Sequence, residues 1–383
     1  MEPFITEEDR RWELITQDDL RWQCSDDPAF REMVLALNDA VSPEARALHR
    51  EMLIVDACTF NVTRYGWRLE AAGATALGCT VPGVFDSAGD AFRAIAAYYG
   101  LPQGDQRFRM IFTPEDIPEA KKAGQTGLII AAQGCNFVQA FDMEPLLLAF
   151  SRLGLRIMQI GYNYRSFAAD GCFSPSNAGL SDNGPELIRL MEKYGITVDL
   201  SHIGERSALE ASELAQKPQI YSHSNPRALF DHPRNISDEQ AKKCAATGGV
   251  IGVSGYNVTL WDGKRFPNID SFVDCIAYYC DLLGPEHVGV GMDTTATEGC
   301  YPRDEILYFN RLVRQVSGKN AVAYQSFLQG RPAPLGNCVE GLMCLANWVR
   351  LVDRMLQRGF SAEEIRQIGG ENWLRVFRAT WPH

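Results

Sequence analysis

Ile196-Thr197-Val198-Asp199-Leu200-Ser201-His202 and Pro218-Gln219-Ile220-Tyr221-Ser222-His223 are two short strand-like runs that both end on a serine and a histidine. A helical stretch separates them, so we expect two neighbouring parallel strands. In α/β barrels the active site lies at the C-terminal ends of the strands. Because neutral imidazole is the commonest metal ligand, His202 and His223 form a candidate metal site, the alternative being two structural histidines.

The alternation of apolar runs and helical stretches continues on both sides of this pair. Eight runs are predicted to be strands: 52–57, 74–80, 127–132, 155–160, 196–200, 219–221, 250–253 and 287–291. Helices of the connections are predicted at 91–99, 144–151, 186–194 and 238–246. Alternating β and α units indicate a parallel sheet. Eight of them favour a closed (β/α)8 barrel of the TIM type over an open sheet.

The chain ahead of the first predicted strand is polar and helical, with Pro28 and Pro43 as breaks. We therefore expect an N-terminal helical extension over residues 1–50 and a barrel domain with C-terminal helices over 51–383.

Two patterns indicate helices near the C-terminus. Apolar residues recur at spacings of three and four, which predicts one buried helical stripe of Leu342, Leu345, Val349, Val352 and Leu356. Ser361 and Glu364 have the spacing of a capping box that begins a further helix. Residues 302–336 are rich in Pro, Gly and Arg and are predicted to form a long loop or lid.

Composition excludes several classes of partner. The net charge of −11 argues against nucleic acid and against an anionic membrane surface. No apolar run approaches the roughly 18 residues of a spanning helix, and the acidic start of the chain, residues 1–10, is unlike a secretory signal. We therefore expect a cytoplasmic protein. The 11 cysteines form no CxxC pair, which indicates reduced, buried thiols rather than a disulfide framework.

Further polar residues follow other predicted strands. Cys58 follows the first, Gln133 the third, Tyr162 and Tyr164 the fourth, and Asp293 the eighth. A carboxylate beside a metal can ligate it or take a proton from a bound water. For Asp293 the alternative is a turn or helix-cap aspartate.

From about Met52 to Phe377 the sequence resembles the membrane (renal) dipeptidase family. The segments that carry the resemblance are Asp199-Leu200-Ser201-His202, Tyr221-Ser222-His223-Ser224, Arg234-Asn235, Gly248-Gly249-Val250 and Gly370-Glu371-Asn372-Trp373-Leu374-Arg375-Val376-Phe377. The resemblance implies an amidohydrolase-type barrel with a two-zinc centre that hydrolyses dipeptides. It also implies that His202 and His223 bind one zinc, that Arg234 grips the substrate carboxylate, and that Asp293 serves the attacking water.

The chain departs from the family at the other metal ligands. The family's His-x-Asp pair after the first strand reads Cys58 and Phe60, and its bridging glutamate reads Gln133. The histidine that polarises the scissile carbonyl reads Tyr162. A neutral carboxamide cannot bridge two dications as a carboxylate does, and phenylalanine offers no ligand atom.

These departures predict one zinc ion at most, or none. The two histidines would then be joined by the Cys58 thiolate, or by Asp293 and a water, which is the pattern of a catalytic site. The alternative for Cys58 is a small buried hydrophobic residue.

The expected function is hydrolysis of a dipeptide or of a peptide-derived small molecule that bears a carboxylate. Arg234, Gln133 and Tyr164 are the expected substrate contacts, and Tyr162 could replace the lost histidine as a hydrogen-bond donor or acid. Two alternatives stay open: a non-hydrolytic step such as an elimination or rearrangement, and a non-catalytic binding protein.

Two further points also stay open. Arg234 could instead be a structural residue paired with Asp231 or Asp238. A homodimer is compatible with the sequence.

Overall fold

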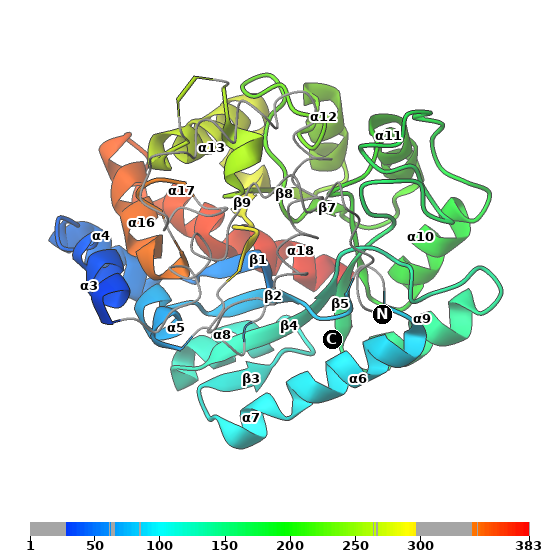
Figure 1. The fold of residues 1–383 in the computed structure, drawn as a ribbon, viewed down its shortest axis with the longest axis horizontal. Coiled ribbons are helices and arrows are strands. Elements are labelled where there is room, and N and C mark those ends of the chain that lie inside the picture. Colours follow the sequence, from blue (N-terminus) through cyan, green and yellow to red (C-terminus); the bar gives the residue numbers. More distant parts are fainter. Residues whose placement is uncertain are drawn as a thin grey trace, which may run out of the picture.

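A computed structural model of the protein describes residues 28–60, 62, 66–83, 86–262, 264–265, 267–295, 339–342 and 344–382. Its centre is a ring of parallel strands surrounded by helices (Figure 1). The strands are β1 (Val55–Phe60), β2 (Ala76–Thr80), β3 (Phe108–Met110), β4 (Thr126–Ala132), β5 (Leu155–Gln159), β6 (Thr197–Asp199), β7 (Ile220–Tyr221), β8 (Val250–Val253), β9 (Val288–Val290) and β10 (Thr294–Thr295).

The strand order is β10-β1-β2-β4-β5-β6-β7-β8-β9, and every pair is parallel. β10 follows β9 after Gly291-Met292-Asp293 and pairs with β1, where Thr294 lies opposite Thr59. This pairing brings the last strand of the ring back to the first. β3 pairs with β4 outside the ring.

Helices alternate with the strands and cover the outside of the ring (Figure 1). They are α3 (Pro28–Ala36), α4 (Pro43–Glu51), α5 (Trp67–Ala72), α6 (Ala88–Tyr99), α7 (Leu101–Gly104), α8 (Asp116–Ala123), α9 (Met143–Arg152), α10 (Gly184–Lys193), α11 (Glu205–Leu214), α12 (Asp238–Ala246), α13 (Ile269–Leu283), α16 (Trp348–Gln357), α17 (Ala362–Arg366) and α18 (Asn372–Thr380). Shorter turns are η2 (Asn257–Leu260), η3 (Pro285–His287), η6 (Leu345–Asn347) and the π-helical η7 (Gln367–Glu371).

Segments far apart in the sequence lie side by side at one edge of the molecule, where α4 contacts α16 and α3 contacts η6 (Figure 1). The Ser42 backbone N–H donates to Asp353 Oδ1 at 3.1 Å, and Asn347 Nδ2 donates to the Val34 carbonyl at 3.0 Å. The first two described helices are therefore tied to the C-terminal part of the chain.

One end of the barrel is covered by α18. The Trp381 indole donates to Thr197 Oγ1 at the start of β6, and Asn372 Nδ2 donates to the Val288 carbonyl at the start of β9. Trp373 packs so closely that a Cβ on Gly289 would lie 2.6 Å from its indole ring. α18 covers the N-terminal ends of the strands, and the predicted site residues lie at the opposite, C-terminal end.

The (β/α)8 barrel and its eight predicted strands are confirmed; β3 and β10 were not predicted. The capping box of Ser361 and Glu364 is confirmed at the start of α17. The predicted C-terminal stripe is wrong at its beginning, because Leu342 lies ahead of η6 and α16 begins only at Trp348. The predicted lid, 302–336, lies outside the described residues, as does the extension up to residue 27.

The cysteines of the described segments are free thiols, and most of them are buried, as predicted. Within the same segments, none of the helices combines the length and the apolar character that crossing a membrane requires.

Candidate active site

The structure brings His202 and His223 together at the C-terminal ends of β6 and β7. Both side chains are buried, and their Nε2 atoms lie 3.0 Å apart. His202 has a left-handed backbone with φ +68°, a conformation that a residue other than glycine adopts at a cost. The backbone strain at this position is consistent with a functional constraint on the imidazole.

The partners of the other ring nitrogens decide where the imidazole protons lie. His202 Nδ1 is 2.7 Å from Asn163 Oδ1, an oxygen that can only accept. His223 Nδ1 is 2.6 Å from Ser222 Oγ, and the Ser222 hydroxyl donates to Asp199 Oδ2 at 2.5 Å. Both Nδ1 atoms therefore carry the proton, and both Nε2 lone pairs point at each other.

Two lone pairs 3.0 Å apart repel unless a cation or a proton lies between them. Zinc–nitrogen bonds of about 2.0–2.1 Å allow two imidazoles on one ion to approach this closely. Burial lowers the pKa of both histidines well below the usual range, and the positive charge of Arg234 adds to this effect. The imidazoles are therefore neutral at physiological pH, which is the form that binds a metal.

Cys58 and Asp293 lie next to His223. One ligand atom each of Cys58, His223 and Asp293 lies within 4.8 Å of the others. The Cys58 thiol donates to Asp293 Oδ1 at 3.6 Å, and Gln133 Nε2 donates to Cys58 Sγ at 3.0 Å. Burial and the neighbouring carboxylates raise the Cys58 pKa well above its usual range, against a smaller opposite effect of Gln133. Without a cation the thiol keeps its proton.

The pKa of the Asp293 carboxyl lies close to neutral pH. Burial raises its pKa to about 6, although Arg234 and hydrogen bonds from Cys58 and Gln133 oppose the shift. Like His202, Asp293 has a left-handed backbone, with φ +54°. Its peptide N–H donates to the Cys58 carbonyl at 3.0 Å, so the ends of β1 and β9 are held side by side.

Asp56 is a second buried carboxyl of the same region. Its Oδ1 accepts from the backbone N–H groups of Cys58, at 3.1 Å, and Met292, at 2.9 Å. Its Oδ2 is buried without a hydrogen-bond partner among the described residues. Burial raises the Asp56 pKa to about 8, so this carboxyl is protonated at neutral pH and joins the two strand ends as a neutral group.

Arg234 is buried, with only 6% of its surface exposed. It donates from Nη1 to Ser224 Oγ at 3.1 Å and from Nη2 to the His223 carbonyl at 2.8 Å. In the described part of the chain no carboxylate lies within ion-pair distance of it, and the Asp238 carboxylate instead accepts from the Tyr278 hydroxyl. The alternative pairing of Arg234 with Asp231 or Asp238 is thus not formed, and the guanidinium keeps donors for an anion.

The two predicted tyrosines lie differently. The Tyr162 ring stacks on the His202 imidazole, with centroids 4.2 Å apart and 28° between the planes. Tyr164 is exposed and tilts toward Phe173, with centroids 6.2 Å apart. Tyr162 therefore borders the histidine pair, whereas Tyr164 lies on the rim.

Asn163, Ser222, Asp199 and Asp56 were not predicted to contribute to this site. Asp199 and Ser222 belong to the repeated strand–Ser–His pattern, and that repetition is the signal from which they could have been found. Asn163 stands between the two predicted tyrosines after the fourth predicted strand, but its role could not be assigned, because its contact with His202 depends on how the loop after β5 folds.

Comparison with known proteins agrees with this geometry. The family model described as Membrane dipeptidase (Peptidase family M19) matches residues 86–321, more than half of the chain. A curated relative, Dipeptidase tcpJ of Claviceps purpurea, is 26% identical over 277 residues, which are 71% of this chain and 55% of that protein. Matches to the first curated relatives span only about half of those proteins, 55%, 51% and 48% of their length.

Solved structures share the fold over most of the chain. An amidohydrolase from Pseudomonas aeruginosa superposes with a TM-score of 0.75 at 27% identity and covers 88% of this chain and 99% of its own. A metallopeptidase from Rhodobacter sphaeroides, liganded with a phosphinate mimic of L-Ala-D-Ala, superposes with a TM-score of 0.69 at 17% identity and covers 86% and 99%. With the barrel, the paired histidines and the family match together, the chain belongs to the membrane dipeptidase family, Peptidase family M19.

Proposed function

We propose that this chain is a metal-dependent hydrolase that acts on a dipeptide, or on a peptide-derived small molecule with a free carboxylate, and holds a single zinc ion. The observation that carries the proposal is the pair of buried, neutral imidazoles whose Nε2 lone pairs converge at 3.0 Å, beside a buried guanidinium without an ion-pair partner among the described residues.

His202 and His223 would hold the ion, with Cys58 as the third protein ligand. A zinc ion with three protein ligands and an open position activates water near neutral pH. Asp293 would accept a proton from a water bound there. Since its pKa is about 6, the basic carboxylate form is present above that pH.

Arg234 would bind the carboxylate of the substrate. The buried guanidinium forms no ion pair among the described residues, and a bidentate carboxylate would give it direct charge-assisted hydrogen bonds. We assign Gln133 and Tyr164 to further substrate contacts, and Tyr162, next to the histidine pair, to donation of a hydrogen bond or proton.

A second zinc ion is not part of this proposal. Where the family has its His-x-Asp pair and its bridging glutamate, this chain has Cys58, Phe60 and Gln133. The Gln133 amide donates to the Cys58 sulfur, so it acts as a hydrogen-bond donor there and not as an anionic bridge.

The alternative is a non-hydrolytic step on a related molecule, such as an elimination or rearrangement, or binding without catalysis. The same exchanges favour it, because they remove groups that the family uses to activate water and polarise the carbonyl. Losing one such electrostatic group commonly costs about a hundred- to a thousand-fold in rate.

Turnover by zinc-loaded and metal-free protein separates these functions. A panel of dipeptides, N-acyl amino acids and their C-terminal amides is incubated with wild type and with Asp293→Asn, and products are identified by mass spectrometry. We expect zinc-dependent cleavage of free-carboxylate substrates, slower than the roughly 10 per second of a median enzyme, and loss of cleavage in Asp293→Asn. Zinc-loaded protein that converts none of these molecules, or isomerises them without adding water, contradicts the hydrolase and favours the alternative.

A further inference from the structure

Two buried hydrogen-bond chains end on the candidate metal ligands. One runs from Asp199 through the Ser222 hydroxyl to His223 Nδ1, with lengths of 2.5 and 2.6 Å. The other joins Asn163 Oδ1 to His202 Nδ1 at 2.7 Å. Neither set of hydrogen bonds lies between the two Nε2 atoms. Both contact the imidazoles at Nδ1, on the other side of the ring.

In the Asp199–Ser222–His223 hydrogen-bond chain, the direction of each proton is fixed. Asp199 is buried and, besides the Ser222 hydroxyl, accepts from the backbone N–H groups of Ser201 and Ser222, each at 2.9 Å, and from Gln159 Nε2 at 3.2 Å. Because a carboxylate only accepts, the single Ser222 proton goes to Asp199. The Ser222 oxygen then accepts from His223 Nδ1–H, and His223 Nε2 is left as a lone pair.

Without the hydrogen bond between Ser222 and His223, the metal-free site would have a more stable arrangement of its imidazole protons. If His223 carried its proton on Nε2, it could donate to His202 Nε2 across the same 3.0 Å. That hydrogen bond would occupy the His202 Nε2 lone pair and leave His223 Nε2 protonated, so neither nitrogen would be free for a metal ion. The Ser222 contact therefore favours the tautomer that leaves the site open to a cation.

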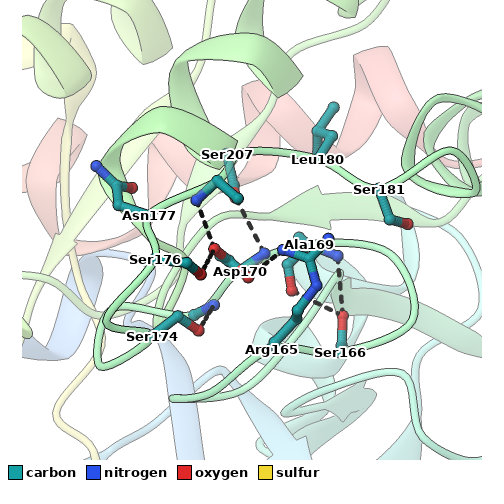
Figure 2. A network of polar contacts seen from close by, with 12 residues as sticks. Arg165, Ser166, Ala169, Asp170, Ser174, Ser176, Asn177, Leu180, Ser181 and Ser207 are labelled. Carbon is teal, nitrogen blue, oxygen red and sulfur yellow. Dashed lines mark hydrogen bonds and ion pairs between the residues drawn. The ribbon is translucent and has the colours of Figure 1, made fainter.

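The second chain starts from a loop with its own anchor, the buried Asp170 carboxylate (Figure 2). Asp170 accepts from Arg165, from the Ser176 hydroxyl at 2.7 Å and from the Ala178 N–H at 2.6 Å. Its backbone is tied to the start of α11, because its N–H donates to Ser207 Oγ at 3.1 Å and its carbonyl accepts from Gly204 at 2.9 Å.

Asn163 is held firmly within this loop. It has φ +56°, and its carbonyl accepts from the Phe173 N–H at 2.7 Å. A Cβ on Gly171 would lie 2.3 Å from the Asn163 carbonyl carbon, so the two segments of the loop pass each other at a point where only glycine fits. The amide oxygen that faces His202 is thus positioned before any ligand binds.

We propose that Ser222 and Asn163 are positioning residues that set the metal affinity of this site by holding both imidazoles in the Nδ1–H form. The inference rests on the proposed function in so far as that function requires a bound metal. Outer hydrogen-bond partners of metal ligands typically contribute about 10- to 100-fold in affinity.

The test is a chelator-competition titration of the full chain with Zn²⁺, and with Co²⁺ for its ligand-field spectrum. Ser222→Ala and Asn163→Ala should each bind about 10- to 100-fold more weakly than wild type. Ser222→Thr and Asn163→Asp keep the oxygen acceptor and should restore most of the affinity.

Matched controls are Ser151→Ala and Asn183→Ala. Ser151 is a buried serine that donates to the Tyr194 carbonyl, and Asn183 lies in the same loop as Asn163 but donates to the Phe167 carbonyl. Both controls should bind like wild type. Equal affinity in wild type, Ser222→Ala and Asn163→Ala overturns the inference alone, whereas a wild type that binds neither ion overturns the proposed metal site as well.

A second measurement needs no metal. Nitrogen-15 NMR of metal-free protein with labelled histidine, of which the chain has 6, reports the tautomers directly. We expect Nδ1–H at His223 in wild type and Nε2–H in Ser222→Ala. Nε2–H at His223 in metal-free wild type would contradict the inference even if a variant folded poorly.

Discussion

Burial largely decides the charge of the described titratable residues at the C-terminal end of the barrel. It keeps His202 and His223 neutral and the Cys58 thiol protonated, and it moves the pKa of Asp293 to about 6 and of Asp56 to about 8. Among these described residues, Arg234 is the cation. Above pH 6 the Asp293 carboxyl is ionised, and a divalent cation must displace a proton to gain the Cys58 thiolate as well.

Asp56→Asn tests the protonated state of the buried carboxyl in metal-free protein. An unfolded carboxyl has a pKa of about 3.9, and Asp56 in the folded chain has a pKa of about 8. Between these values the folded state holds a proton that the unfolded state has lost. Wild-type stability should therefore fall as pH rises, by at most about 1.4 kcal/mol per pH unit, and this contribution should level off above pH 8.

The asparagine keeps an oxygen for the Cys58 and Met292 N–H groups and does not titrate. Urea unfolding at pH 5, 7 and 9 should show Asp56→Asn gaining on wild type as pH increases. A free-energy difference between the two proteins that stays constant over this range would mean that Asp56 is ionised in the folded state.

Arg234→Lys tests the carboxylate contact. Lysine keeps the charge but lacks the planar fork that makes two parallel hydrogen bonds, and it cannot also reach Ser224 Oγ and the His223 carbonyl in the same geometry. Loss of a charge-assisted pair should cost about 1.5–3 kcal/mol, or roughly ten- to a hundred-fold in affinity. Calorimetric titration of N-acyl amino acids measures it, with their amides as the control. Equal affinities of both proteins for the acids would assign Arg234 a structural role.

The loop after β5, residues 160–183, connects β5 to α10 and also supports the Asn163 side chain. Its buried Asp170 carboxylate is held from three sides, and hydrogen bonds from Ala178, Ser176 and Arg165 keep the pKa low despite the opposing effect of burial. The loop is therefore an ordered support for Asn163 rather than a passive linker.

Asp170→Ala and Arg165→Ala form a matched pair of variants for this loop. Arg165 is half exposed, so its loss should cost less than about 1 kcal/mol. Removing the buried carboxylate takes the shared acceptor away from the Ala178 N–H, the Ser176 hydroxyl and Arg165 together, and should cost more, about 1–3 kcal/mol. Urea denaturation gives both values, and hydrogen exchange should show faster opening of the Ala178 amide only in Asp170→Ala. Equal costs in the two variants would mean that the network does not hold the loop.

The elements themselves were largely predictable because buried parallel strands are short apolar runs with helices between them. β3 escaped prediction because Phe108-Arg109-Met110 has a charged residue at its centre and follows the polar run Asp105-Gln106-Arg107. Leu342 is buried and has the spacing of the α16 stripe, but it lies in a turn ahead of that helix. It was assigned to the helix because periodicity alone does not separate a helix from buried residues just before it.

The two ends of the barrel have different roles: helix packing at one end and the candidate active site at the other. α18 and its tryptophans fill the N-terminal end, while His202, His223, Cys58 and Asp293 meet at the other end. Strand direction explains why these site residues could be predicted: in a parallel barrel every residue that follows a strand arrives at the same rim. Asn163 and the proton directions could not be predicted, because they depend on loop packing and side-chain hydrogen bonds.

Zinc-edge anomalous scattering from crystals of the zinc-loaded protein tests the single-metal centre most directly. We expect one peak per chain, about 2.0–2.1 Å from Nε2 of both His202 and His223, and its loss in His202→Ala. Two well-occupied peaks about 3.5–4 Å apart, or a peak away from both histidines, would contradict the single-metal site.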